Sequence, residues 1–104
     1  MKKSVIFPLA AALSLLASQA IHADNNIAMQ SGCLGCHNAT TKLVGPSFKD
    51  IAGKYADQEG IVDELAATVK SGSQGGKWGE VPMPPSPASL ENIKTVISWM
   101  LTHK

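Results

Sequence analysis

The stretch Cys33-Leu34-Gly35-Cys36-His37 decides how this sequence is interpreted, because it contains both cysteines of the 104-residue chain. The Cys-x-x-Cys-His spacing is the attachment signature of c-type haem. Two thiols at this spacing can each add across one vinyl group of the porphyrin and form a thioether. The residue that follows them, His37, then points at the ring face and can ligate iron from the proximal side. The motif therefore predicts one haem c, attached covalently through two thioethers.

Three other interpretations of the two cysteines are weaker. A disulfide between residues so close in sequence closes a tiny loop and gains little chain entropy. A thioredoxin-like redox pair opens a helix that follows a strand, and the sequence contains no strand pattern. A zinc site needs four ligands, and outside the motif only His22 and His103 could add to them. A thiol–disulfide oxidoreductase thus remains the weaker alternative to haem attachment.

The first 23 residues have the pattern of a secretory signal peptide. Lys2 and Lys3 supply a positive start, the stretch Val5–Leu16 is mostly apolar, and small residues follow it. A membrane-spanning helix needs roughly 20 apolar residues, so this run is too short for one. We expect cleavage after Ala23 or after Ala20, export of the chain, and no stable insertion into a membrane.

The sequence is thus divided into a signal peptide, residues 1–23, and a monohaem domain, residues 24–104. The chain is 44% hydrophobic and 16% charged, and its net charge of +1 excludes the dense basic surface that binds nucleic acid. A domain as small as residues 24–104 buries too little apolar surface to be stable without an added core element. A covalently bound haem would provide that element.

Four short helices are expected, with their apolar residues on one face. The first is capped by Asn25 or Asn26 and stops at Gly32. The other three are expected over residues 48–55, 61–70 and 90–101, with N-caps at Ser47 and Ser89 for the second and the fourth and with Gly72 after the third. In the fourth helix, the apolar residues from Leu90 to Leu101 form one stripe. The pattern predicts an all-α fold wrapped around the haem.

A proline-rich loop precedes the last helix. Four of the six prolines of the chain lie at positions 82, 84, 85 and 87, and prolines stiffen a loop. Met83 stands inside this run, and its thioether can supply the sixth ligand of haem iron, opposite His37. His103 is the chief rival and would give a haem with two histidine ligands. His103 lies at the end of the last helix, which we expect to be solvated. We therefore prefer Met83 as the sixth ligand.

Several motifs in the same order and spacing resemble the small class I cytochromes c of the cytochrome c-551 group. They are Cys33–His37, Val44-Gly45-Pro46, Trp78-Gly79, Pro82-Met83-Pro84-Pro85 and Ser98-Trp99-Met100-Leu101. The resemblance covers nearly all of residues 24–104. It implies the single-domain class I cytochrome c fold, in which a short N-terminal helix and the C-terminal helix cross.

The resemblance also implies roles for single residues. Cys33 and Cys36 would form the thioethers, and His37 and Met83 would be the axial ligands. The backbone carbonyl of Pro46 would accept the other imidazole N–H, as second-shell groups do. The Trp78 indole would donate to a haem propionate. The sequence departs from the group in two places: Ser86 stands where Asn is common beside the Met sulfur, and Ile27-Ala28 replace a common aromatic residue.

The function implied is that of a periplasmic one-electron carrier and not of an enzyme, because both axial positions of the iron are filled. Haem iron would cycle between Fe(III) and Fe(II). Partners would be transient, such as a nitrite reductase, a terminal oxidase or a cytochrome bc complex, and the protein would be a monomer. Candidates for a charged rim around a small docking patch are Lys42, Lys70 and Lys77. The alternative is a haem-based sensor or peroxidase-like protein in which Met83 is labile.

Overall fold

The computed structural model describes residues 24–75 and 78–104. The predicted signal peptide, residues 1–23, and the candidate rim residue Lys77 lie outside the described residues. The named elements are η1 (Cys33–Gly35), α2 (Phe48–Tyr55), α3 (Ile61–Ser71) and α4 (Leu90–Met100), and residues 24–30 are also helical. Strand-like pairing within the described ranges is limited to one isolated bridge, between Ser73 and Met83. The all-α prediction is confirmed.

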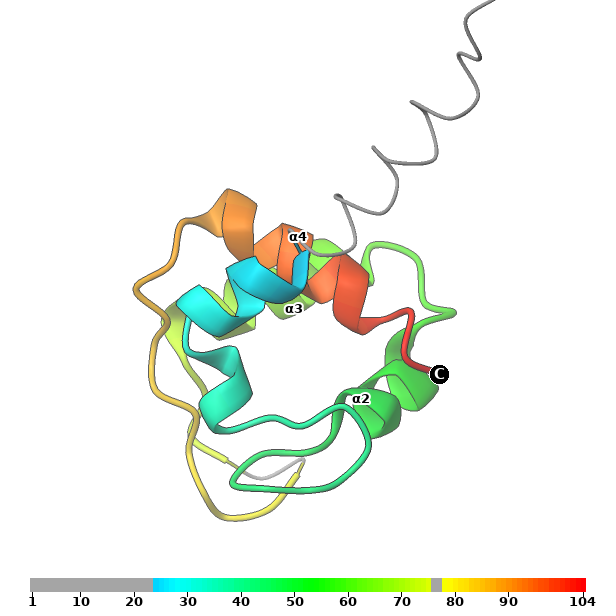
Figure 1. Cartoon of the computed structure of the whole chain (residues 1–104), viewed down its shortest axis with the longest axis horizontal. Coiled ribbons are helices and arrows are strands. Elements are labelled where there is room, and N and C mark those ends of the chain that lie inside the picture. The colour runs from blue at the N-terminus through cyan, green and yellow to red at the C-terminus, as the bar shows by residue number, and fades with distance from the viewer. Residues whose placement is uncertain (1–23, 76–77) are drawn as a thin grey trace, which may run out of the picture.

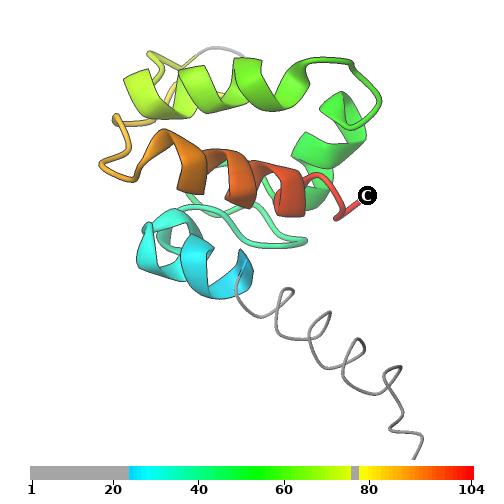
Figure 2. The ribbon, with the colours of Figure 1, turned by 90° about the horizontal axis from the view of Figure 1, so that it is seen from above.

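Three helical segments lie side by side (Figure 2). α4 is in the middle, with α3 on one side and the helix of residues 24–30 on the other. The helices at the two ends of the described chain therefore lie next to each other. α2 lies near the C-terminus, and the connecting segments complete a ring of chain (Figure 1). Within the described part of the chain, none of the helices has the length and apolar character needed to cross a membrane.

The hydrophobic core lies between α2, α3 and α4. Its buried members are Phe48, Ile51, Tyr55, Ile61, Ala66, Ile93, Ile97 and Met100. Leu34 of the Cys-x-x-Cys-His motif packs against this cluster. The motif therefore contacts the core through the side chain of its second residue, Leu34.

The two serine caps are present as predicted. The Ser47 hydroxyl accepts a hydrogen bond from the Asp50 amide (3.1 Å), and the Ser89 hydroxyl accepts one from the Asn92 amide (3.2 Å). Both bonds satisfy an amide that a helix start leaves without an intrahelical partner. α3 ends at Gly72, also as predicted, where φ is 80°.

Two details of the helix prediction are wrong. Residues 24–30 are all helical, so neither Asn25 nor Asn26 is an N-cap, a position that requires a non-helical backbone. Leu90 does not belong to the buried stripe of α4, because 44% of its surface is exposed. It is the first residue of the helix and precedes the turn that contacts the core, where Ile93 is the first buried residue.

Replacing Ser47 by Ala tests the buried cap. Ser47 is 0% exposed, so the substitution leaves the Asp50 amide without its acceptor in a site that water does not easily reach. We expect a loss of about 1–2 kcal/mol in the free energy of unfolding, measured by denaturant titration of the haem-loaded protein. Ser89→Ala, at an exposed cap, is the matched control and should cost less. Equal costs at both caps would contradict the role of burial.

Candidate haem site

The Cys-x-x-Cys-His motif forms a single tight turn. The carbonyl of Cys33 accepts hydrogen bonds from the amides of Cys36 (3.3 Å) and His37 (2.9 Å). This turn places His37 close to both cysteines in space as well as in sequence. Cys33 is half-buried and Cys36 is exposed, and no disulfide joins them. Both thiols are therefore available for covalent attachment.

The imidazole of His37 is oriented by a backbone carbonyl. Its Nδ1 lies 2.8 Å from the carbonyl oxygen of Pro46. Because a carbonyl oxygen only accepts, Nδ1 must carry the proton and donate it, which leaves the lone pair on Nε2. Among the described residues, no group forms a hydrogen bond with Nε2. The ring therefore has the tautomer that a metal-ligating histidine needs, with the second-shell partner that such ligands usually have.

Gly45 lets the backbone lie against this imidazole. A Cβ at position 45 would lie 2.5 Å from Cε1 and 2.9 Å from Nδ1 of His37, closer than real contacts allow. The Gly45 amide donates to the Cys36 carbonyl (2.8 Å), and the Phe48 amide donates to the Asn38 carbonyl (2.9 Å). The segment after the motif is thus held alongside it, and glycine is the residue that fits beside the ring.

Phe48 lies against the same imidazole from the core. Its ring is stacked on His37, with 5.9 Å between centroids and 22° between planes. Phe48 also contacts Trp99 (5.6 Å) and His103 (5.6 Å) edge to face. The imidazole of His37 is therefore held by packing as well as by its hydrogen bond.

The imidazole of His103, the rival ligand, lies against backbone carbonyls at the C-terminal end of α4. Its Nδ1 lies 3.1 Å from the carbonyl of Trp99 and 3.0 Å from that of Met100, and its ring packs on Trp99 at 4.6 Å. His103 itself is half-buried, whereas Thr102 and Lys104 beside it are exposed, so the expectation of a solvated end holds only in part. The aromatic residues Phe48 and Trp99 cover His103. The carbonyl contacts occupy Nδ1 of His103 at the end of α4, which weakens its case as an iron ligand.

Met83 is half-buried, and both its amide and its carbonyl form hydrogen bonds with Ser73. Its amide donates to the carbonyl of Ser73 and its carbonyl accepts from the amide of Ser73, both at 2.9 Å. The proline-rich loop therefore presents the thioether from a backbone that is tied to the end of α3. The Ser86 hydroxyl accepts from the Ala88 amide (3.2 Å).

Trp78 is held by the last turn of α2. The Lys54 ammonium lies 4.8 Å from the centroid of the Trp78 ring, a cation–π distance. The Tyr55 ring lies 6.4 Å from it, edge to face. The Trp78 indole N–H donates to no described residue, so it is available to an acceptor such as a propionate.

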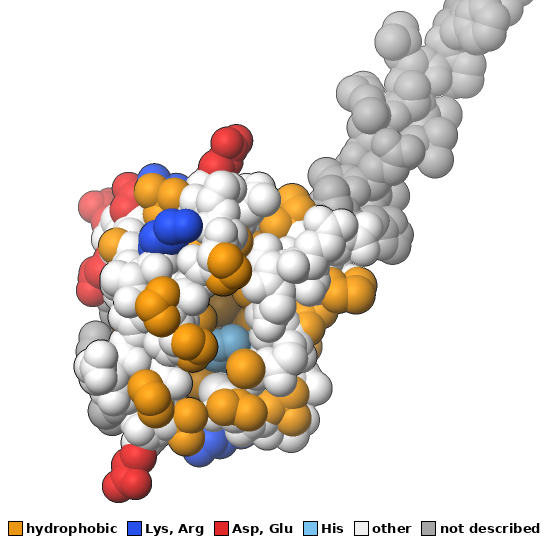
Figure 3. Space-filling model, turned by 90° about the vertical axis from the view of Figure 1, so that its left-hand side faces the viewer, with side chains coloured by type: hydrophobic (Ala, Val, Ile, Leu, Met, Phe, Trp, Pro, Cys, Tyr) orange, Lys and Arg blue, Asp and Glu red, His pale blue; other side chains and the backbone are white. Residues whose placement is uncertain are grey.

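The surface around the motif is hollow and apolar. Figure 3 views the side of the molecule where the motif turn and the proline-rich loop lie, and it shows a histidine side chain inside a hollow with hydrophobic side chains around it. Four large apolar side chains in the adjoining loops are exposed: Leu43, Val44, Trp78 and Val81. Exposed apolar side chains that gather in one patch commonly mark a ligand or partner site. The hollow, the Nε2 lone pair and the Cys, His and Met donors fit haem c.

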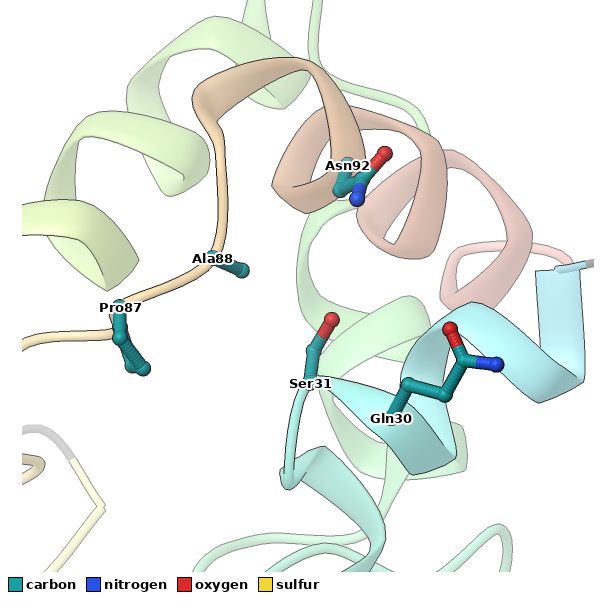
Figure 4. Close-up of a pocket in the computed structure, with 5 residues that line it drawn as sticks. All are labelled: Gln30, Ser31, Pro87, Ala88 and Asn92. Carbon is teal, nitrogen blue, oxygen red and sulfur yellow. The ribbon is translucent and has the colours of Figure 1, made fainter.

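A separate pocket of about 270 Å³ lies between the first helix and α4 (Figure 4). Its lining residues are Gln30, Ser31, Pro87, Ala88 and Asn92. None of them is a metal ligand or carries a charge. The pocket includes none of the candidate haem-binding residues.

The competing interpretations of the cysteines find no support. Burial raises the pKa of the Cys33 thiol as a free group, whereas the attacking cysteine of a thiol–disulfide oxidoreductase has a lowered pKa. In residues 24–75 and 78–104, no three His, Cys, Asp or Glu side chains come together as a site for a metal ion. The zinc interpretation requires such a cluster.

Sequence reasoning missed three residues that shape the site. Gly45 was part of a motif, but its contact with His37 was not foreseen. The stacking of Phe48 on His37 and the position of Lys54 over Trp78 were not foreseen either. The Gly-Pro pair that follows the motif was the one available signal, because a glycine beside a functional residue often marks a close backbone approach.

Comparison with known proteins agrees with this geometry. The cytochrome c family model matches residues 25–104. Cytochrome c-551 of Azotobacter vinelandii is 55% identical over 70% of this chain and 88% of its own length, and cytochrome c-551 of Pseudomonas aeruginosa is 42% identical over 100% of both. The crystal structure of cytochrome c552 from Nitrosomonas europaea, 43% identical, superposes with a TM-score of 0.73 over 77% of this chain and 99% of that one.

The all-α fold and the Cys, Cys, His donor turn define a small c-type haem protein. The family match over residues 25–104 and the similarity to a cytochrome c-551 along the whole chain identify the family within this class. The chain belongs to the class I c-type cytochromes of the cytochrome c-551 family. Its cofactor is covalently bound haem c, and it is an electron-carrier cytochrome.

Proposed function

We propose that this protein is a periplasmic one-electron carrier in which Cys33 and Cys36 form the thioethers and His37 and Met83 are the axial ligands. The observation that carries the proposal is the 2.8 Å hydrogen bond from His37 Nδ1 to the Pro46 carbonyl. It commits one imidazole nitrogen to the protein and leaves the other as the only one that can bind iron. Bound haem supplies one iron centre that exchanges a single electron between Fe(III) and Fe(II).

The residues of the chain keep the site the same in both oxidation states. The Pro46 carbonyl and the Phe48 ring hold the imidazole of His37. The backbone of Ser73 holds the backbone of Met83 through two hydrogen bonds. Rigid ligands make electron exchange fast because little structure has to change. A thioether is a soft neutral donor that favours Fe(II) and raises the potential. Trp78, steadied by Lys54, would donate its indole N–H to a propionate.

Export and partners belong to the same proposal. Residues 1–23 would be a cleaved signal peptide and residues 24–104 the monohaem domain. Exposed apolar side chains around the hollow, such as Val44 and Val81, would form a small transient docking patch for a reductase, an oxidase or a cytochrome bc complex. With such brief contacts the carrier itself would be a monomer.

The haem-sensor or peroxidase-like alternative requires a methionine that leaves the iron easily. The paired backbone of Met83 and the stiff proline loop favour a closed carrier instead. The two functions differ in one measurement, the binding of carbon monoxide to the reduced protein at neutral pH. A closed carrier should bind it poorly, whereas ready binding would support the alternative.

Mass spectrometry of the exported protein, combined with a reduced-minus-oxidised visible spectrum, tests the attachment. We expect a polypeptide that begins after Ala23 or Ala20 and carries one haem that denaturant does not release. Cys36→Ala should leave at most one thioether, and the double variant Cys33→Ala/Cys36→Ala should carry no covalent haem. Covalent haem on the double variant would contradict the assignment of the cysteines.

A further inference from the structure

The proline-rich loop has few backbone hydrogen-bond donors, and each of them has a partner. Proline has no backbone N–H, so residues 82–88 contain three amide donors. The Met83 amide donates to the Ser73 carbonyl (2.9 Å), the Ser86 amide to the Val69 carbonyl (3.0 Å), and the Ala88 amide to the Ser86 hydroxyl (3.2 Å). Two of these bonds reach the end of α3. The loop therefore depends on that end for its position.

Gly72 brings the loop into direct contact with the end of α3. A Cβ at position 72 would lie 2.8 Å from the Met83 carbonyl oxygen and 2.9 Å from the backbone nitrogen of Pro85, and φ at Gly72 is 80°. Only glycine adopts this conformation easily and leaves the space that the loop backbone occupies. The Met83 side of the loop is thus fixed by backbone contacts.

The Ala88 side of the loop is fixed by a side chain. The Lys70 ammonium, in the last turn of α3, donates to the carbonyl of Ala88 at 2.6 Å, across 18 residues of sequence. Ala88 packs against the core one residue before the N-cap of α4. This bond is exposed to solvent, so we expect it to contribute about as much as one ordinary hydrogen bond. Backbone bonds at one end and Lys70 at the other therefore hold the segment that carries Met83.

We infer that Lys70 is a positioning residue for Met83, acting through the loop and not through a docking partner. The inference rests on the proposed function, because it concerns the proposed sulfur ligand. Without the ammonium, the Ala88 carbonyl loses its protein partner and the loop opens more often. Each opening weakens the placement of the thioether.

Two substitutions and a control test this role. Lys70→Met keeps an unbranched apolar side chain and removes the donor, whereas Lys70→Arg keeps a donor. Lys94→Met is the matched control, because Lys94 is a lysine of α4 that pairs with Asp63 of α3 at 3.0 Å and has no bond to the loop. Amide hydrogen exchange of the reduced haem-loaded proteins reports loop opening directly.

In Lys70→Met, we expect exchange at the Met83 and Ser86 amides to speed up roughly fivefold, the factor that the loss of one ordinary hydrogen bond implies. The absorption band of sulfur bound to Fe(III) should also disappear at a lower temperature than in the unaltered protein. Lys70→Arg should restore most of both properties. Lys94→Met should leave exchange at these two amides unchanged.

Equal exchange at Met83 and Ser86 in Lys70→Met and Lys94→Met would overturn the inference. Failure of the proposed function gives a different result. The unaltered protein would then lack the sulfur–iron band altogether, whatever residue stands at position 70.

Discussion

Met83→Ala should convert the protein from a closed carrier into one with an open iron position. We expect the reduced variant to bind carbon monoxide at neutral pH and the oxidised variant to lose the sulfur–iron absorption band. The midpoint potential should fall by on the order of 0.2 V, a part of the roughly 0.8 V range that axial ligands span. The reason is that the soft thioether stabilises Fe(II) more than Fe(III).

The control for this variant is Met29→Ala. Met29 belongs to the first helix and is 56% exposed, so the same atoms are removed without touching the proline-rich loop. Its spectrum and potential should match those of the unaltered protein. Redox titration and carbon monoxide binding are the two measurements. If the potential of Met83→Ala stayed within a few tens of millivolts of the control, the assignment of the sulfur ligand would be wrong.

Gly45→Ala should disturb the proximal ligand without changing any donor atom. The added methyl group would lie 2.5 Å from Cε1 of His37. The imidazole cannot easily turn away, because the Pro46 carbonyl holds one edge and the Phe48 ring is stacked on it. We expect a loss of about 1–3 kcal/mol in the free energy of unfolding, as for other overpacked sites. The NMR signal of the Nδ1 proton should shift or exchange faster.

Gly53→Ala is the matched control for this change. Gly53 lies in α2, and a Cβ there would meet nothing within 4 Å. Because alanine favours a helix over glycine, this variant should be stabilised by about 0.5–1 kcal/mol. The two Gly-to-Ala changes therefore have opposite expected signs in denaturant unfolding of the haem-loaded protein. A Gly45→Ala variant as stable as the unaltered protein, with its Nδ1 proton unchanged, would show that the close approach has no consequence.

Local features of the sequence were predicted well. Ser47 and Ser89 cap the helices they precede, and Gly72 ends α3, because each of these signals acts within a turn of chain. The same local logic failed at Asn25 and Asn26. Both have good capping side chains, yet the helix already includes residue 24. A residue can be an N-cap only at the position where the helix begins.

The donor set of the candidate site stays a prediction. Residue type and spacing point to Cys33, Cys36, His37 and Met83, because haem attachment and ligation demand particular atoms in a particular order. Sequence reasoning does not predict the environment of these donors. His103 packs on Phe48 and Trp99, and the Lys54 ammonium lies over the Trp78 ring. Both arrangements depend on how segments far apart in the sequence pack against each other.

By itself, the sequence determined the chemistry and the helical segments of this protein, because a covalent attachment motif, helix caps and apolar periodicity are written in neighbouring residues. Only the tertiary structure decided which groups hold the ligands. Gly45 against the His37 ring and Lys70 on the Ala88 carbonyl join residues from different segments. Such contacts arise when α2, α3 and α4 pack around one core, and no pattern of adjacent residues encodes the distances between them.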